Sequence, residues 1–579
     1  MINSKRDELL TDCAKAMLKD RYLSKGETPQ DLFARVAKYY STDSEHAERL
    51  YNYMSLQWFM PATPILSNGG TKRGLPISCF LNEVEDSLKG IGNTHFENIH
   101  LASGGGGIGT YWGGVRGNGD KIREEMTSSG IIPFLKVQDS STLAISQGNL
   151  RRGSAATYIA VSHPEIEEFI EIRRPTGGDP NRKCMNLHHG IAIDDKFMNA
   201  VANGDNYDLI SPSTGKAVET VKARDIWIKI LTARIETGEP YLLFIDNVNN
   251  NLPKHHKELG LKVKTSNLCS EITLPTGYDH KGNFRTAVCC LSSLNLEHYK
   301  KWVEDEQFIY DVMLFLDNVL QDFIDNAPAG YENAVYSATQ ERSVGLGVMG
   351  FHSFLQSEMI PFESLIARGW NNKIFSYIKE KVDQASIDIA KLRGACPDDE
   401  SGTHRFTNKT AIAPTASISI ICGGASPGIE PIAGNSYVQK NLSGSFAIRN
   451  KFLEALLKEK GKNTDEVWSS ISTTNGSVQH LEFLSNDEKN VFKTAYELNQ
   501  RYLVDFACDR QKYIDQAQSL NIFLPSDVHK KDLHGLHFMG WKNGLKSFYY
   551  CRSQSLQRAD IVSVKQEEIN NYEECLSCQ

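Results

Sequence analysis

The chain has 579 residues, of which 40% are hydrophobic and 23% charged, the balance of an ordinary globular protein. Its formal net charge of −8 excludes a general positive field for nucleic acid, and no apolar run is long enough to span a bilayer. Charges scattered through the N-terminus argue against a secretory signal, so the twelve cysteines predict a cytoplasmic protein whose thiols are kept reduced for chemistry.

Three regions follow one another along the chain. Residues 1–60 are predicted to be helical, with an amphipathic helix over SEHAERLYNYMSLQWF. Residues 61–550 alternate strand-like and helix-like segments, which predicts one large α/β domain built on a sheet or barrel. Residues 551–579 are polar and charged and are predicted to form a mobile tail. Within the large domain, strands are predicted at 265–274, 285–296 and 409–421, and a helix at 311–327.

A literal G-x-G-x-x-G occurs at Gly104, Gly106 and Gly109. The dinucleotide-binding fingerprint needs a strand before the glycines and a helix after them. Here the glycines continue into TYWGGVRGNGD, which is typical of a loop. We therefore reject a dinucleotide fold and expect a backbone that lies close to another group, with side chains excluded.

The stretch SNLCSEI alternates an amide, a thiol and a carboxylate at Asn267, Cys269 and Glu271. In an extended segment, these three side chains share one face and point into the same space. A surface strand could show the same polar alternation for solubility alone, so the stretch by itself leaves both interpretations open.

Four further cysteines belong with Cys269. Cys79 lies early in the chain, Cys289 is followed directly by Cys290, and Cys575 and Cys578 form a C-x-x-C near the C-terminus. Structural zinc usually needs two such pairs or nearby histidines, and the sequence has no second C-x-x-C. A C-x-x-C on a polar tail favours thiol–disulfide exchange over a zinc site.

Six short motifs occur in one order along the chain. They are Ser78–Cys79, N-L-C-S-E at 267–271, C-x-L-S-S-x-N-L from Cys289, P-T-A-S-I-S from Pro414, G-I-E-P at 428–431 and F-Y-Y at 548–550. Together they resemble the large, catalytic α subunit of class I ribonucleotide reductase. The resemblance covers almost the whole chain, from about residue 20 to the terminal cysteines.

The resemblance implies a fold and an activity. The fold is a ten-stranded α/β barrel of two five-stranded parallel halves, with a central finger loop that carries the radical cysteine. The activity is reduction of ribonucleoside diphosphates to 2′-deoxyribonucleoside diphosphates for DNA synthesis by thiyl-radical chemistry. Only 78 residues precede Cys79, so we expect a compact form without the N-terminal ATP cone and without overall inhibition by dATP.

The resemblance also implies roles for the catalytic residues. Cys269 matches the thiyl radical that takes the 3′ hydrogen of the substrate. Glu271 matches the base that accepts the 3′-hydroxyl proton, and Asn267 matches a hydrogen-bond partner of the substrate hydroxyls. Cys79 and Cys289 match the reducing pair that ends each turnover as a disulfide.

Radical supply and re-reduction are implied in the same way. Tyr549 and Tyr550 match the tyrosines that carry the radical from a separate metal-containing β (small) subunit, so no cofactor or metal is expected on this chain. Cys575 and Cys578 match the disulfide shuttle, which a thioredoxin or glutaredoxin reduces. Cys290 is not required by the family pattern, and we expect a small buried residue.

Binding residues carry over position by position. The substrate contacts implied are Thr63, Ser78, Gly106, Gly107, Pro414, Thr415, Ala416, Ser417 and Ile418. Contacts to an allosteric dNTP or ATP that controls substrate choice are implied for Asp86, Arg116, Arg123, Gln147 and Arg152, with 146–157 as a flexible loop between effector and substrate. The family further implies a homodimer with effector sites at its interface.

Other functions remain open on the sequence. An adenosylcobalamin-dependent (class II) reductase shares the barrel and cysteines but needs no tyrosine relay, so Tyr549 and Tyr550 discriminate against it. A glycyl-radical enzyme should carry a glycine-radical segment near the C-terminus, and we find none in the sequence. A non-catalytic relative or metal-binding scaffold would have no reason to hold the five cysteines together with Asn267 and Glu271.

Overall fold

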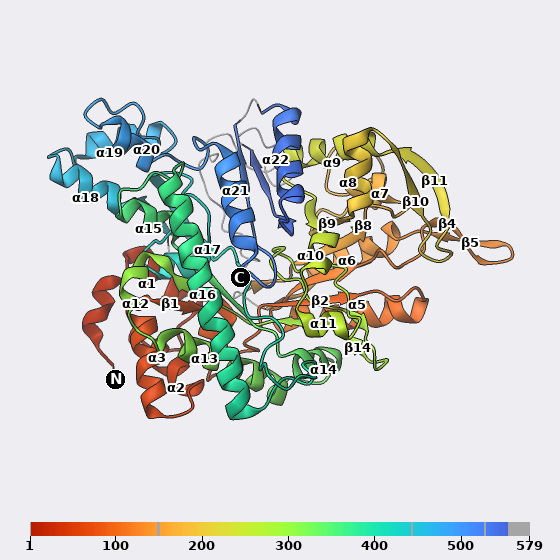
Figure 1. Ribbon diagram of the computed structural model, residues 1–579, viewed down its shortest axis with the longest axis horizontal. Coiled ribbons are helices and arrows are strands. Elements are labelled where there is room, and N and C mark those ends of the chain that lie inside the picture. Colours follow the sequence, from red (N-terminus) through yellow and green to blue (C-terminus); the bar gives the residue numbers. More distant parts are fainter. Residues whose placement is uncertain (1, 148–150, 442–443, 526–527, 554–579) are drawn as a thin grey trace.

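The computed structural model describes residues 2–147, 151–441, 444–525 and 528–553 (Figure 1). The helical character predicted for the first sixty residues is confirmed. The helices are η1 (Ser4–Leu9), α1 (Asp12–Arg21), α2 (Pro29–Tyr39) and α3 (Ser44–Ser55). Local chemistry explains where α2 starts: Thr28 and Asp31 form a reciprocal capping box, and proline occupies the first helical position. Arg49 of α3 connects these helices to Asp311 of helix 308–326. It donates two hydrogen bonds, of 2.6 and 3.1 Å, to the buried carboxylate.

A seven-stranded sheet forms the first half of the barrel. Its order is β15-β2-β3-β8-β9-β12-β21, and the five central strands run parallel. The strands are β2 (Cys79–Glu83), β3 (Gly107–Tyr111), β8 (Ala155–Ala160), β9 (Leu187–Ile193), β12 (Tyr241–Phe244), β15 (Ala287–Cys289) and β21 (Ser547–Phe548). The connecting helices are α5 (Leu88–Ser103), α6 (Ile132–Ala144), α7 (Ile166–Ile170), α8 (Asp195–Asn203) and α9 (Ala223–Thr237). Strand and helix alternate, as parallel pairing requires.

The second half of the barrel is less regular. Strand β16 pairs in parallel with β17, and isolated parallel bridges then join Leu346 to Thr410 and Ile412 to Gln518. The strands here are β1 (Phe59–Pro61), β16 (Leu291–Asn295), β17 (Gly345–Met349), β20 (Ile522–Leu524) and β22 (Cys551–Ser553). Flanking helices are α4 (Thr63–Asn68), α13 (Phe308–Asn326), α14 (Glu332–Glu341), α15 (Phe351–Ser357), α16 (Leu365–Arg393), α17 (Ala416–Ile421), α21 (Gln500–Gln511) and α22 (Lys530–Lys542).

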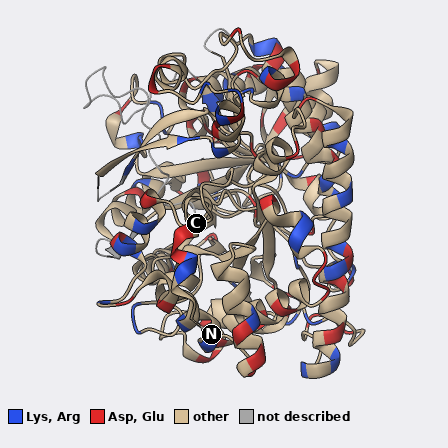
Figure 2. Cartoon of the chain, turned by 90° about the vertical axis from the view of Figure 1, so that its left-hand side faces the viewer, with Lys and Arg blue, Asp and Glu red and all other residues tan. Residues whose placement is uncertain are grey.

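Peripheral elements complete the chain. Figure 1 shows helices α18 to α20 as a separate lobe, and a second hydrophobic core containing Leu453, Trp468 and Phe492 explains why it holds together. This lobe comprises β18 (Ser436–Asn441), β19 (Gly444–Arg449), α18 (Lys451–Glu459), α19 (Asp465–Thr473) and α20 (Asn486–Val491). Short hairpins are β4 (Asn118–Arg123) with β5 (Met126–Ser129), β6 (Ser146–Gln147) with β7 (Arg151–Arg152), β10 (Asn206–Ile210) with β11 (Ala217–Lys222), and β13 (Gly277–Tyr278) with β14 (Phe284–Arg285). The remaining helices are η2 (Pro180–Arg182), α10 (Ile245–Asn250), α11 (Lys254–Glu258), η3 (Leu296–His298) and α12 (Tyr299–Trp302). Figure 2 shows basic and acidic residues mixed along the outer helices.

The glycine run leads from a helix into a strand. It follows α5 and enters β3, the reverse of the strand-to-helix order of the dinucleotide fingerprint, so rejecting that fold was correct. The prediction of a loop after Gly109 is wrong in part, because β3 extends to Tyr111. A Cβ atom built on Gly109 would lie 2.0 Å from the carbonyl oxygen of Ser266. The group that lies close to the glycine strand is therefore the segment that carries Cys269.

That segment, residues 264–276, crosses the barrel interior without forming helix or strand, and we call it the finger. The strand predicted over 265–274 is wrong. Ser270 has a φ of +64°, in the left-handed region, and its N–H donates to the carbonyl of Asn267 at 3.3 Å. The three predicted residues therefore lie on a turn and not on one face of a strand.

Of the other predicted elements, the structure confirms two and confirms a third only in part. Residues 285–296 form β14, β15 and β16, and the helix predicted at 311–327 lies in α13, so both are confirmed. The strand predicted over 409–421 is confirmed only at its two bridges, because α17 begins at Ala416. Thr415, with φ of +56°, marks the break.

The contact between β3 and the finger predicts the cost of adding one methyl group. Gly109→Ala must displace finger backbone, and we expect the free energy of unfolding to fall by about 3 kcal/mol, the upper range for overpacking. Thermal denaturation measures the change. Gly369→Ala is the matched control: it lies in α16 with open space around its Cβ position, so it should leave stability unchanged or slightly raised. Equal melting temperatures for the two variants would contradict this packing.

Candidate active site

Cys79 and Cys289 face each other across two strands. They are directly paired residues of the antiparallel strands β2 and β15, and both are buried. Burial, and then the hydrogen bond with the Cys79 thiol, raise the pKa of Cys289 well above its usual value. Opposite residues of antiparallel strands have Cα atoms about 4.5–5.5 Å apart, inside the range that a disulfide requires. The two thiols can therefore be oxidised to a disulfide without moving the backbone.

Glu271 lies beside this thiol pair. Burial, and then the proximity of Cys79, raise its carboxyl pKa to about 8, although hydrogen bonds, including that from Ser519, oppose the shift. The Ser519 hydroxyl donates to Oε2 of Glu271 at 2.9 Å. At neutral pH the carboxyl group is therefore mainly protonated, with a pKa in the range that suits a general base.

Asn267 is held by one end of its amide. Its Oδ1 accepts the backbone N–H groups of Glu271 and Ile272, both at 3.1 Å, which fixes the turn of the finger. Its Nδ2 is buried and has no hydrogen-bond partner within the residues that the structure describes. Because a buried donor without an acceptor is costly, this amide indicates a missing ligand group.

Cys269 packs with aromatic residues. It belongs to a buried cluster with Leu268, Tyr158, Tyr241 and Tyr549, against which Tyr550 also packs. The rings of Tyr549 and Tyr550 have centroids 4.3 Å apart, and Tyr241 lies 4.7 and 5.0 Å from them. The predicted radical thiol and the predicted tyrosine pair therefore lie in one cluster, although they are far apart in the sequence.

The predicted substrate residues lie at three places in the fold, of which Ser78 and Gly107 border Cys79. The backbone N–H of Gly107 donates to the carbonyl of Ser78, and a Cβ atom at Gly107 would lie 3.5 Å from Sγ of Cys79. Gly106 immediately precedes β3. Thr63 opens α4, with its hydroxyl 2.8 Å from the phenol of Tyr22. Residues 414–418 form the start of α17, which packs against α1.

Two of the predicted effector residues follow the C-terminal ends of β2 and β3. Asp86 and Arg116 form an ion pair with several contacts near 3.0 Å. Arg123 is exposed at the end of β4. Gln147 and Arg152 lie in the two-residue strands β6 and β7, and residues 148–150 between them lie outside the described part of the chain.

Comparison with known proteins identifies the family. A family model described as "Ribonucleotide reductase, barrel domain" matches residues 77–405 and 399–551, and one described as "Ribonucleotide reductase, all-alpha domain" matches residues 8–74. The chain belongs to the ribonucleotide reductase large-subunit family. It is 42% identical to the ribonucleoside-diphosphate reductase large subunit of Invertebrate iridescent virus 3, over 97% of this chain and 96% of that protein.

More distant relatives agree. The large subunit of Caenorhabditis elegans is 31% identical over 91% of this chain and 73% of that protein. The solved class Id ribonucleotide reductase alpha subunit of Actinobacillus ureae has a TM-score of 0.84 and 36% identity, over 95% of this chain and 98% of that chain. The α/β barrel expected from the sequence is therefore confirmed as the fold of this ribonucleotide reductase chain.

Some predicted residues fall outside this site or outside the description. Cys290 is buried, as expected, and its thiol faces the carbonyl of Leu316 at 3.8 Å. The tail cysteines Cys575 and Cys578 lie outside the described residues. No helix in the described part of the chain is long and apolar enough to cross a membrane. No group of three or more His, Cys, Asp or Glu residues there could hold a metal ion.

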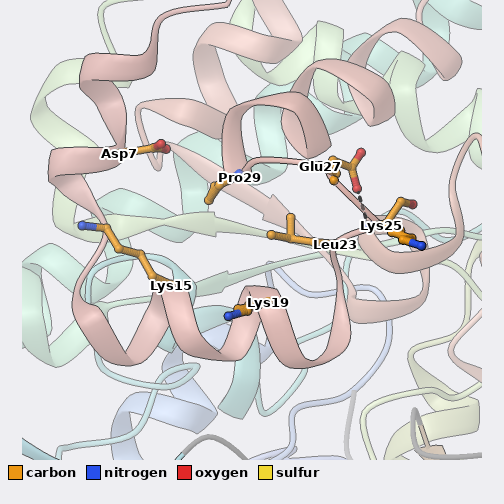
Figure 3. A pocket seen from close by; sticks show the side chains of 9 residues that line it. Asp7, Lys15, Lys19, Leu23, Lys25, Glu27 and Pro29 are labelled. Atoms are coloured by element: carbon orange, nitrogen blue, oxygen red, sulfur yellow. Dashed lines mark hydrogen bonds between the residues drawn. The ribbon is translucent and has the colours of Figure 1, made fainter.

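An open hollow of about 520 Å³ lies elsewhere, beside α1 (Figure 3). Lys15, Lys19 and Lys25 line it, together with Asp7 and Glu27. None of the candidate catalytic residues borders it.

Sequence reasoning missed several residues of the site. Ser519 donates both to the carbonyl of Cys269 and to the carboxyl of Glu271, and the Tyr158 phenol donates to the carbonyl of Asn267 at 2.7 Å. Tyr241 adds a third ring to the tyrosine pair. These residues come from remote segments and form no motif, so only the fold brings them to notice.

The raised pKa of Glu271 predicts a pH-dependent stability. The unfolded chain releases this proton above about pH 4.5, whereas the folded chain holds it up to about pH 8. The stabilising contribution is therefore present at low pH and lost as pH rises through this window. Glu271→Gln carries no such proton. We expect its free energy of unfolding, relative to wild type, to rise by about 3–5 kcal/mol between pH 5 and pH 8.5.

Denaturation in urea over this pH series measures the difference. Glu482→Gln changes an exposed carboxyl in the same way and serves as the control, for which the difference should stay flat. A flat difference for Glu271→Gln as well would show that its carboxyl is not held protonated.

Proposed function

We propose that this chain is the catalytic subunit of a class I ribonucleoside-diphosphate reductase, with the site residues in the roles that the sequence assigned. One observation carries the proposal. The finger brings Glu271 beside the thiols of Cys79 and Cys289 and packs Cys269 among the tyrosines. A hydrogen-abstracting thiol, a base and a two-electron reductant are what reductive removal of a ribose hydroxyl requires.

The reaction begins at Cys269. As a thiyl radical, it takes the 3′ hydrogen of the ribose, which leaves a carbon radical beside the 2′-hydroxyl. The Glu271 carboxylate accepts the 3′-hydroxyl proton, and the unpaired Nδ2 of Asn267 donates to a substrate hydroxyl. Because the pKa of Glu271 is raised to about 8, its base form increases from pH 7 to pH 9.

Reduction then uses the facing thiols. The 2′-oxygen leaves as water, and Cys79 and Cys289 supply two electrons and two protons as their sulfurs join. The balance is one ribonucleotide and two thiols converted to one deoxyribonucleotide, one disulfide and one water. Cys269 returns the 3′ hydrogen to the substrate and becomes a thiyl radical again. The radical can then pass back toward the small subunit.

The tyrosine cluster supports a class I radical supply. Tyr549 is buried in contact with the Cys269 cluster, whereas Tyr550 is only partly buried, so the pair leads from the surface toward the thiol. A small subunit would deliver the radical at Tyr550. An adenosylcobalamin-dependent enzyme would generate the thiyl radical locally and would have no use for this pair. The structural match to a class Id alpha subunit also favours class I.

Re-reduction of the buried disulfide requires a carrier that reaches it. Cys575 follows Ser553, the last described residue, by 22 positions. An extended chain of that length spans up to about 75 Å, compared with a radius of gyration of about 25 Å for a compact chain of this size. We propose that Cys575 and Cys578 reduce the disulfide and are themselves reduced by thioredoxin or glutaredoxin in the cytoplasm. Residues 551–553 were predicted to belong to the tail but form strand β22, so we place the start of the proposed redox tail at residue 554. The tail then follows the barrel, which begins at residue 61 after the helices of 1–60.

Substrate would occupy the space beside the finger. We propose Thr63, Ser78 and the backbone of Gly106 and Gly107 as its contacts. Support comes from Ser78 and Gly107, which border Cys79. The start of α17, at Pro414, Thr415, Ala416, Ser417 and Ile418, suits the diphosphate, since the positive end of a helix dipole favours anions.

We propose that effector binding and dimerisation use the same face of the molecule. Asp86, Arg116, Arg123, Gln147 and Arg152 would bind a dNTP or ATP, and phosphate would compete with Asp86 for Arg116. Helices α5 and α6 pack against each other beside these residues and expose the large apolar side chains of Leu88, Phe96, Ile99, Val137 and Leu143. Apolar patches of this kind mark protein interfaces, so we propose this face as the homodimer contact.

The catalytic role of Cys269 is tested by turnover. Cys269→Ser should reduce CDP reduction to background in the presence of the small subunit, because the Ser hydroxyl cannot form the hydrogen-abstracting radical. Effector binding should remain intact. Cys508→Ala, at another largely buried thiol, should keep wild-type turnover. Turnover by Cys269→Ser, or cobalamin-dependent turnover by the chain alone, would overturn the class I assignment.

The dimer face is tested by sedimentation equilibrium. Phe96→Asp places a charge where 62% of the side chain is exposed, and we expect the protein to sediment as a monomer at concentrations where wild type is dimeric. Leu392→Asp, at a leucine of α16 that is 64% exposed, should leave the dimer unchanged. Identical sedimentation of Phe96→Asp and wild type would exclude this face.

A further inference from the structure

The side chain of Ser519 lies between two parts of the proposed catalytic site. Its hydroxyl oxygen is 2.5 Å from the carbonyl oxygen of Cys269 and 2.9 Å from Oε2 of Glu271. Ser519 is buried, so both contacts are made inside the protein. A serine hydroxyl has a single proton, so at any moment it can donate to one of these two oxygens and not to both.

The backbone around Ser519 is held by the fold. Its N–H donates to the carbonyl of Ile412 at 2.9 Å, and the carbonyl of Leu520 accepts the N–H of Tyr549 at 3.0 Å. Both acceptors of the hydroxyl already lie within hydrogen-bond distance. The hydroxyl can therefore change its acceptor by rotation of the O–H bond alone, without movement of either chain segment.

The charge of Glu271 determines which acceptor is preferred. A hydrogen bond to an ionised carboxylate is roughly twice as strong as one between neutral groups, so the hydroxyl donates to Oε2 when Glu271 is ionised. When Glu271 is protonated, that advantage is lost and the closer carbonyl of Cys269 is preferred. Because burial raises the pKa of Glu271 to about 8, both states are populated between pH 7 and pH 9.

Other titratable groups surround this contact. Burial raises the pKa of Cys289 and of Tyr158, so neither side chain ionises near neutral pH. Among the surrounding groups, only Glu271 presents an ionisable atom to the Ser519 hydroxyl. The groups that face Glu271 or adjoin the segment of Ser519 are Cys79, Cys269, Cys289, Tyr158, Arg510 and Asp515.

We infer that Ser519 is a positioning residue that transfers its hydrogen bond from Glu271 to the backbone of Cys269 when Glu271 takes up the substrate proton. This inference rests on the proposed function, in which Glu271 accepts the 3′-hydroxyl proton. Ser519 neither gains nor loses a proton, because its O–H bond stays intact and only changes direction. Proton uptake by the base thereby strengthens the hold on the residue that carries the radical.

The pH dependence of turnover tests the effect on the base. Ser519→Ala removes a hydrogen bond that favours ionised Glu271, so we expect the rising limb of the pH profile for CDP reduction with the small subunit to move up by about one pH unit. Turnover should fall about tenfold at pH 7 and about twofold at pH 9. Ser519→Thr keeps a hydroxyl and should keep the wild-type profile. Ser386→Ala, at a buried serine of α16 whose hydroxyl accepts a backbone N–H, is the matched control and should also keep it.

The carbonyl of Cys269 tests the other half of the inference. Full-length protein that contains [1-13C]cysteine gives an infrared band for this carbonyl, which comparison with Cys269→Ser identifies. In wild type we expect the band to move to higher wavenumber from pH 6.5 to pH 9.5, because ionised Glu271 draws the hydroxyl away. The band should stay in place in Glu271→Gln, which cannot ionise, and in Ser519→Ala, which has no hydroxyl.

The two measurements distinguish failure of the inference from failure of the proposed function. A wild-type carbonyl band that does not move with pH would overturn the inference and leave Glu271 as the base, and this result needs no substitution at Ser519. A deficit of Ser519→Ala that is equal at every pH would show a structural effect only and would also overturn it. Full turnover by Glu271→Gln would overturn the base assignment itself, and the inference with it. Melting temperatures near that of wild type establish that the variants are folded.

Discussion

The finger enters the barrel without helix or strand, so every hydrogen bond that water would make to its backbone must come from neighbouring protein groups. Those groups are drawn from across the fold: Tyr158 from β8, Ser519 and Ala517 from the second half, and the side chain of Asn267 from the finger itself. Each of these bonds fixes one atom of the segment that carries Cys269. Both halves of the barrel therefore fix the conformation of the finger, and the proposed chemistry depends on how completely they supply hydrogen bonds to its backbone.

Burial gives the centre its electrical character. The facing thiols are held neutral, and the carboxyl of Glu271 is mainly protonated at neutral pH, so the buried centre contains little charge. Charge lies nearer the surface, where the partly exposed Asp86 pairs with Arg116. A centre with little charge suits the proposed radical chemistry, and a charged margin suits the proposed effector contacts.

The sequence predicted which residues form the candidate site better than it predicted the local structure that positions them. Asn267, Cys269 and Glu271 were selected from their alternation and from the resemblance, yet they lie on a turn at Ser270 and not on a strand. No local sequence pattern predicts that a serine will adopt a left-handed backbone conformation. Cys79 and Cys289 were selected by resemblance, whereas their direct pairing depends on strand register, which only the sheet determines. Ser519 could not be predicted, because its partners Cys269 and Glu271 lie 250 and 248 residues away in the sequence. Alternation and helical periodicity were sufficient for the N-terminal helices, α13 and β16, where local preference and burial agree.

Strand β3 has a consequence for how the chain folds. Its glycines leave one face bare, so the strand has little side-chain packing of its own and gains it only when the finger covers it. The finger, in turn, has no regular structure to support it beforehand. The two segments are about 160 residues apart in sequence. Joining them therefore requires closure of a long loop before either segment gains stabilising contacts. The barrel wall from β8 to β12 can assemble from neighbouring segments, whereas the reactive centre forms late. An incompletely folded chain would therefore lack the proposed radical site, which would spare the cell an uncontrolled oxidant.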